Sequence, residues 1–166
     1  MTDLALLFSE HGDFDLMVEA GDLLGDEGLT TAITISLFTD RLARQDDPLP
    51  EHLPGQVSDR RGYWGSLARR PNLDDANEII GSRLWLLHRE KELQAVVHRA
   101  QDYAGEGLAW LPALGGAVQL EVTAPGHGRL QIDVEARDNG PNRRTQRWTA
   151  FLDYNEKRVV ELKGAR

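Results

Sequence analysis

Residues 117–137 read AVQLEVTAPGHGRLQIDVEAR, and this stretch decides the fold class. In its first half Val118, Leu120 and Val122 alternate with other residues, and the second half alternates in the same way. A period of two places apolar side chains on one face of a β-strand. Between the halves, APGHG at 124–128 is typical of a hairpin turn. The stretch therefore predicts two antiparallel strands with one buried face.

Two further segments extend this hairpin into an antiparallel meander. Residues 147–154 alternate again, with Trp148 on one face and Phe151 on the other. Residues 158–162 predict an additional edge strand, and DNGPNRRT at 138–145 is typical of a loop. We therefore assign 138–166 to a variable pair of C-terminal strands.

Upstream of the meander the apolar spacing is that of a helix. Residues 90–104 carry apolar side chains on one helix face, at Leu93, Val96, Val97, Ala100 and Tyr103. Residues 29–42 carry a similar stripe. The β-branched Thr30, Thr31 and Thr34 leave a strand open for part of that segment.

Shorter segments complete the order of elements. DFDLMV at 13–18 predicts a short strand, and the glycine- and acid-rich 21–28 predicts a loop. GSRLWLL at 81–87 predicts an apolar helical turn that Ser82 caps, and Pro112 is expected to end one further turn. Helices thus precede a β-meander, which is the order of an α+β domain. The 166 residues suit one domain spanning the whole chain.

The long connection 45–81 is rich in proline and glycine, so little regular structure is expected in it. Its centre, DRRGYWG at 59–65, puts arginines beside aromatic residues, the types that dominate protein interfaces. The residues expected to contact partners are Arg60, Arg61, Tyr63, Trp64, Trp148 and Phe151. The alternative for the loop is arginine–tryptophan stacking within the domain.

Charge is unevenly distributed along the chain. The net charge of −8 argues against nucleic acid as a partner, because phosphate binding needs a concentrated positive surface. Residues 1–30 hold eight acids and no Lys or Arg, whereas residues 137–166 hold eight bases against four acids. This polarity suits contacts with neighbours of opposite charge. No apolar run is long enough to cross a bilayer, so no membrane role is expected.

The sequence lacks the spacings of common catalytic and metal sites. There is no cysteine, no HExxH and no GxxxxGK[ST] or GxSxG motif, so we expect no catalytic residues, cofactor or metal. Asp46 and Asp47 lie in a DDP stretch that is typical of a turn. Arg83 is a candidate for an internal ion pair with an acid of the N-terminal segment. A glycan-cleaving enzyme, which needs only two carboxylates in a cleft, remains the alternative.

Five strings carry a family resemblance. They are GLTTAITISLFTDRLA (28–43), DDPLP (46–50), DRRGYWG (59–65), GSRLWLLHREK (81–91) and AQDYAGEGLAWL (100–111). In order and spacing they resemble the Mu-like phage tail and baseplate family described as phage protein "gp forty-six". That family is in turn similar to the small wedge protein of T4-like baseplates, which has carried a lysozyme label.

The resemblance implies a non-enzymatic structural subunit of a contractile tail baseplate, located in the virion after assembly in the host cytoplasm. Its implied partners are larger wedge proteins, the tail sheath subunit and hub or tube proteins. The C-terminal strands would offer an edge on which the first ring of sheath is templated. A lysozyme-like tail enzyme is the alternative that the resemblance keeps open.

Overall fold

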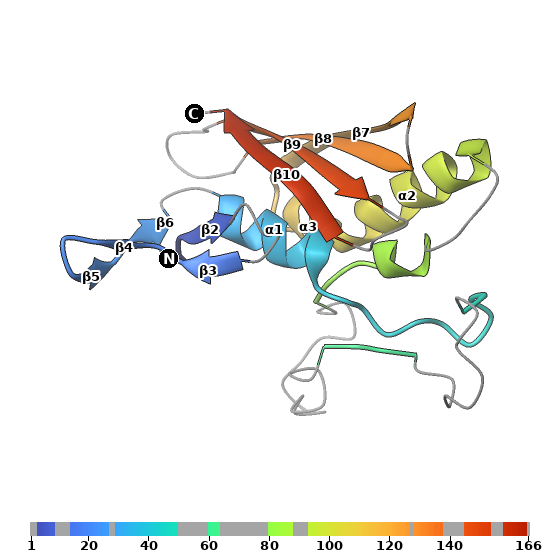
Figure 1. Cartoon of the computed structure of the whole chain (residues 1–166), viewed down its shortest axis with the longest axis horizontal. Helices are drawn as coiled ribbons and strands as arrows, with labels where there is room; N and C mark the ends of the chain where they lie inside the picture. The colour runs from blue at the N-terminus through green and yellow to red at the C-terminus, as the bar shows by residue number, and fades with distance from the viewer. Residues whose placement is uncertain are drawn as a thin grey trace.

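The computed structural model describes residues 3–8, 14–26, 29–49, 60–63, 80–87, 93–126, 128–137, 145–153 and 158–165. Within these residues a four-stranded antiparallel sheet is covered on one face by helices (Figure 1). Three short two-stranded ribbons lie to one side of this two-layer body. The fold class is α+β, as the sequence predicts.

The sheet is a meander whose strands lie in the order β10-β9-β8-β7. Their bounds are β7 (Ala117–Gly126), β8 (Arg129–Arg137), β9 (Thr145–Asp153) and β10 (Arg158–Ala165). All three neighbouring pairs are antiparallel. The structure confirms the predicted hairpin, the third strand and the additional edge strand. Alternating apolar residues predict them correctly, because alternation places the apolar side chains of a strand on one face of the sheet.

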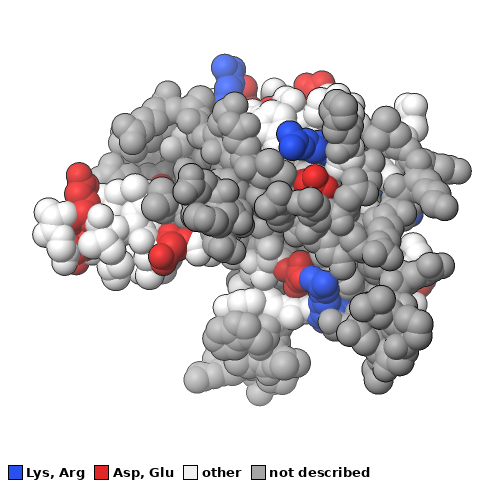
Figure 2. Space-filling model, viewed as in Figure 1, with Lys and Arg blue, Asp and Glu red and all other residues white. Residues whose placement is uncertain are grey.

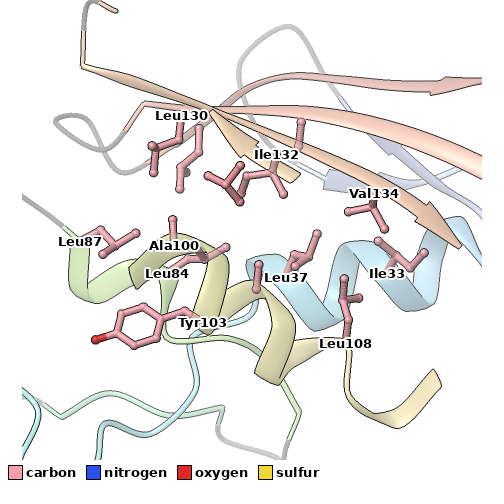
Figure 3. Close-up of a cluster of buried hydrophobic side chains, with 14 of the residues drawn as sticks. Ile33, Leu37, Leu84, Leu87, Ala100, Tyr103, Leu108, Leu130, Ile132 and Val134 are labelled. Carbon is pink, nitrogen blue, oxygen red and sulfur yellow. The ribbon is translucent and has the colours of Figure 1, made fainter. Parts of the chain in front are cut away.

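The inner face of the sheet packs on α2 (Leu93–Gly107). Figure 3 shows Leu130 and Ile132 pointing from the sheet toward Ala100 of this helix, and all three side chains are fully buried. The helix extends past the predicted end at residue 104. Gly107 allows α2 to lie against α1, since a Cβ there would meet the Ser36 carbonyl oxygen at 2.7 Å.

The second core helix is α1 (Thr30–Phe38), which confirms a helix within the predicted range 29–42. The strand alternative is not adopted; Thr31 and Thr34 are buried within the helix instead. The Asp26 carboxylate accepts a hydrogen bond from the Thr31 N–H (2.7 Å). It therefore satisfies a free donor at the positive end of the helix.

The GSRLWLL segment forms the 3₁₀ turn η2 (Leu84–Leu87), whose four side chains are buried. The Ser82 hydroxyl accepts a hydrogen bond from the first N–H of this turn and donates one to the Leu37 carbonyl. The predicted cap is thus confirmed, and it also ties the turn to α1. Gly81 has a φ of +94°, and a Cβ there would overlap the Thr39 carbonyl oxygen. The two segments can approach this closely only with glycine at that position.

One further helical turn, α3 (Trp110–Ala113), follows α2. Pro112 was expected to end this turn but lies inside it. Proline is tolerated in the first turn of a helix, because the N–H that it lacks would have no partner within the helix.

The described residues at 3–8 and 14–26 form three two-stranded antiparallel ribbons. Their strands are β1 (Asp3–Leu4) with β6 (Gly25–Asp26), β2 (Leu6–Phe8) with β3 (Phe14–Leu16), and β4 (Val18–Glu19) with β5 (Asp22–Leu23). The ribbons meet where three backbone hydrogen bonds form a closed ring. Ala5 N–H donates to Leu24 (2.8 Å), Leu24 to Met17 (2.9 Å) and Met17 to Ala5 (2.9 Å).

These ribbons confirm the strand predicted at 13–18 for its described part, and they correct the loop predicted at 21–28. Residues 22–23 and 25–26 are strands. Ala20 and Gly21 have φ angles of 52° and 85°, the left-handed conformation of a tight two-residue hairpin turn. The glycine that suggested a loop therefore connects two paired strands.

The described parts of the predicted connection, residues 45–49, 60–63 and 80–81, contain no helix or strand, as expected of them. No described helix is long and apolar enough to cross a membrane.

Candidate functional site

The arginine-rich segment 60–63 lies against the core. The Arg61 guanidinium forms an ion pair with Asp40, and its Cζ lies 5.2 Å from the centre of the Trp85 ring. The Trp85 indole N–H in turn donates to the Arg41 carbonyl (2.8 Å). Arg61 is therefore engaged within the chain, as in the stacking alternative, although its aromatic partner comes from η2.

Arg60 and Tyr63, which lie on either side of Arg61 in this segment, are partly buried. Arg60 is half-buried, and its carbonyl accepts a hydrogen bond from the Ala43 N–H (3.1 Å). Its Nη2 atom is buried and has no hydrogen-bond partner in the described part of the chain. Tyr63 is half-buried as well, and Trp64 lies outside the described residues. Partner contacts by these residues remain predictions.

Trp148 was expected to contact partners and instead lies in the core, only 4 % exposed. It projects from β9 on the same face as Ala150 and Leu152, which are buried too. Its indole N–H donates to the Thr30 hydroxyl of α1 (3.1 Å). This tryptophan thus packs the sheet onto α1, and its partner-contact role is corrected. Phe151 lies half-buried on the opposite face of β9, so partner contact there stays a prediction.

A shallow hollow on the outer face of the sheet gathers three acids, Glu121, Asp133 and Glu135. Each of the last two already accepts a hydrogen bond from β9. The Thr149 hydroxyl donates to Asp133 (2.5 Å), and Arg147 forms an ion pair with Glu135 (2.6 Å). Within the described residues, no group of three or more His, Asp or Glu side chains is arranged to hold a metal ion.

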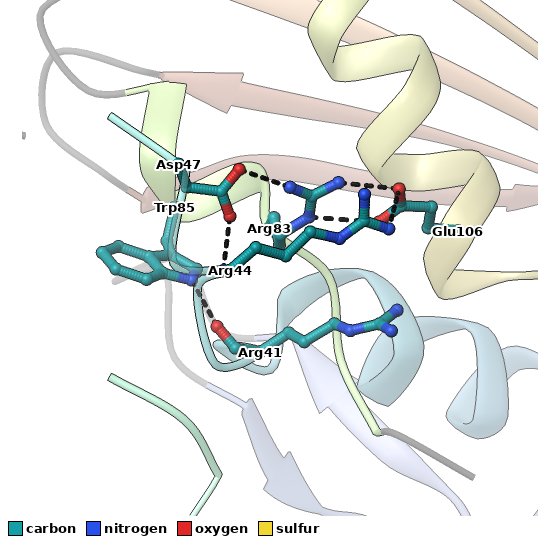
Figure 4. A network of polar contacts seen from close by, with 6 residues as sticks. All are labelled: Arg41, Arg44, Asp47, Arg83, Trp85 and Glu106. Carbon is teal, nitrogen blue, oxygen red and sulfur yellow. Dashed lines mark hydrogen bonds and ion pairs between the residues drawn. The ribbon is translucent and has the colours of Figure 1, made fainter. Parts of the chain in front are cut away.

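The strongest polar cluster lies at the C-terminal end of α2 (Figure 4). Arg83, only 5 % exposed, forms ion pairs with Asp47 (2.5 Å) and Glu106 (2.7 Å). Arg44 also pairs with Glu106 (2.9 Å), and its backbone N–H donates to Asp47 (2.7 Å). The Tyr103 ring lies 4.4 Å from the Arg83 Cζ. The cluster joins the start of the long connection to η2 and α2.

Burial and charge act in opposite directions on these groups. Burial alone would raise the pKa of Asp47, but hydrogen bonds from Arg83 and the Arg44 N–H outweigh it and lower that pKa. Burial would likewise lower the pKa of Arg83, yet its bonds to Glu106 and Asp47 raise it. Burial raises the pKa of Tyr103. The cluster therefore keeps the Asp47 carboxylate ionised and the Arg83 guanidinium charged.

The prediction that Arg83 forms an internal ion pair is confirmed, but its partners are Asp47 and Glu106 and not an acid of the N-terminal segment. Asp47 lies in the turn that DDP predicts, since its N–H donates back to the Arg44 carbonyl (3.2 Å). Glu106 lies three residues after Tyr103, on the same side of α2, which is a signal that helical spacing offers. Neither acid comes from the N-terminal thirty residues.

The two edges of the sheet differ. On β7 the Leu120 carbonyl accepts a hydrogen bond from the Gln101 side chain of α2 (2.7 Å), so part of that backbone is bonded to the helix. At the opposite edge, β10 pairs with β9 on one side, and no described strand pairs with its other side. Exposed edges of this kind accept additional strands through main-chain hydrogen bonds.

The four charged residues of this cluster lie within the part of the chain that a known protein family matches. The family model of phage protein GP46 matches residues 29–143, which include α1, η2, α2 and the β7–β8 hairpin. The chain belongs to the phage protein GP46 family. It is 45 % identical over 125 residues to "Baseplate protein gp46" of Escherichia phage Mu, a match that covers 75 % of this chain and 77 % of that protein.

A second family member is the Mu-like prophage FluMu protein gp46 of Haemophilus influenzae. It is 35 % identical over 151 residues, covering 89 % of this chain and 96 % of the relative. No solved structure matches the chain.

Proposed function

We propose that the chain is a structural subunit of a contractile phage tail baseplate, that it has the wedge role and that it acts without catalysis. Membership of the GP46 family, with a relative named as a baseplate protein of phage Mu, carries the proposal. The chain is then a component of the virion tail that binds other baseplate proteins. Larger wedge proteins, hub or tube proteins and the sheath subunit are the partners we assign to it.

The sheet edge supports a role in starting the sheath. β10 offers backbone donors and acceptors along its outer side, whereas β7 at the other edge is bonded in part to α2. A strand from the first sheath ring can extend the meander at β10. Main-chain hydrogen bonds would supply affinity there, and the antiparallel register would fix the orientation of the added strand.

The Asp47 carboxylate does not suit the acid of a glycan-cleaving site. A glycan-cleaving acid needs a raised pKa, so that it still carries a proton near neutral pH. Asp47 has a lowered pKa and is paired with Arg83. Purified chain incubated with peptidoglycan is expected to release no fragments, and reproducible release would contradict this part of the proposal.

Two neighbouring proline substitutions test the β10 edge. Along an edge strand, successive N–H groups point alternately toward the inner strand and outward. Of Leu162→Pro and Lys163→Pro, therefore, one removes a bond to β9 and lowers the Tm, while the other removes an outward donor. The variant that keeps the wild-type Tm is introduced into the phage or prophage that encodes the chain. Its tails, viewed by negative-stain electron microscopy, are expected to carry baseplates without sheath.

The matched controls are the single variants Leu162→Ala and Lys163→Ala, which change the same side chains but keep every backbone N–H donor of β10. Both alanine variants are expected to assemble sheath normally. Full-length sheath on tails of the stable proline variant would contradict templating at β10, while leaving the baseplate location of the chain intact.

A further inference from the structure

The β4–β5 ribbon, residues 18–23, projects from the body of the molecule (Figure 1). We call it the tip hairpin. Val18 is 65 % exposed and Leu23 46 % exposed, and the two are direct cross-strand partners. Leu4 and Leu16 add exposed apolar surface nearer the junction of the ribbons. An isolated two-stranded ribbon has no second layer on which to bury such side chains.

The tip hairpin has two different faces. Val18 and Leu23 lie opposite each other, so their side chains point to one face of the ribbon. Glu19 and Asp22 are the next cross-strand pair, so they point to the other face, and both are exposed. Figure 2 shows this end of the molecule as white and red surface. An apolar face is thus backed by an acidic one, within thirty N-terminal residues that hold no Lys or Arg.

The backbone holds the tip hairpin in place. Ala20 has a φ of 52°, an unusual conformation for a residue other than glycine, and Gly21 continues the turn at 85°. At its base, the ring of hydrogen bonds among Ala5, Met17 and Leu24 fixes the ribbon to the other two. A projection whose shape is set before binding loses little conformational entropy when it docks.

We infer that the tip hairpin inserts into another protein subunit of the tail, into an apolar recess bordered by Lys or Arg. The exposed Val18–Leu23 pair fills the recess, and Glu19 with Asp22 meets the basic border. The excess of acids on this arm favours a basic surface of another subunit over the equally acidic arm of a second copy. This inference rests on the proposed baseplate function.

The test replaces the apolar pair and measures incorporation into tails. Val18→Thr combined with Leu23→Thr keeps β-forming residues and removes apolar surface. Because both side chains are exposed, the double variant is expected to keep the wild-type Tm. Its amount in purified tails, measured by quantitative immunoblot against sheath protein, is expected to fall at least tenfold. Leu114→Thr, at a leucine that is 71 % exposed on the body, is the matched control and is expected to be incorporated normally.

Charge and self-association are tested separately. Glu19→Gln with Asp22→Gln is expected to lower incorporation several-fold, and no loss would overturn the basic border. Normal incorporation of the threonine double variant, or a lowered Tm, would overturn the docking role. Self-association of the purified wild-type chain that the double variant lacks, seen by analytical ultracentrifugation, would make a second copy the occupant and overturn the proposed partner. Absence of the wild-type chain from tails would refute the baseplate function itself, a result distinct from these.

Discussion

Arg83→Met tests the polar cluster most sharply, because it removes the cation and keeps an unbranched apolar side chain against Tyr103. Two carboxylates then lose their partner: Asp47, whose side chain is 8 % exposed, and Glu106, which is 28 % exposed. Removing one member of a buried ion pair costs about 3–5 kcal/mol. Glu106 retains its bond to Arg44, so we expect a loss near the lower limit, about 3 kcal/mol in the free energy of unfolding.

The loss also depends on pH in a defined direction. The folded-state pKa of Asp47 is lowered, so its contribution to stability is present above the unfolded pKa of about 4 and is lost as pH falls through the folded value. Arg83→Met lacks this contribution. The difference in stability between wild type and variant is therefore expected to be largest near pH 7 and to narrow below about pH 4.

Urea unfolding followed by tryptophan fluorescence measures both effects. Arg147→Met is the matched control, because Arg147 forms its ion pair with Glu135 while 70 % exposed. An exposed pair of this kind contributes less than about 1 kcal/mol. Equal losses for the two methionine variants, or a difference that does not change with pH, would refute the account of the cluster.

Two further pairs of substitutions test the core with the same unfolding assay. Gly81→Ala is expected to cost roughly 3 kcal/mol or more, because the new Cβ overlaps the Thr39 carbonyl oxygen, while Gly126→Ala, with open space around it, costs roughly 1 kcal/mol. Equal costs would contradict the close approach at Gly81. Trp148→Ala is expected to cost about 3–5 kcal/mol and Phe151→Ala less than about 2 kcal/mol. A larger loss for Phe151 would contradict the core position of the tryptophan.

The part of the fold that could be predicted from sequence depends on local periodicity. The meander follows from alternation in 117–137 and 147–154, since a period of two has one structural solution when one face is buried. The same alternation places Trp148 beside Ala150 and Leu152, so its burial was accessible from the sequence. Its assignment to a partner surface gave residue type more weight than position in the strand.

The rest of the fold depends on contacts between distant segments, for which a single sequence holds no signal. Arg83 meets Asp47 and Glu106 only because η2 lies between the connection and α2. The ring of hydrogen bonds among Ala5, Met17 and Leu24 joins backbone groups, and the side chains of these residues form no sequence pattern that predicts it. The proposed function comes from the family resemblance instead, through strings that include Asp47, Arg83 and Glu106.

Cryo-electron microscopy of purified tails tests the central claim most directly. We expect density for this chain in the baseplate, next to the tail tube, with the outer side of β10 continued by a strand from the first sheath ring. A complete tail whose baseplate density contains no copy of this chain would contradict the structural role.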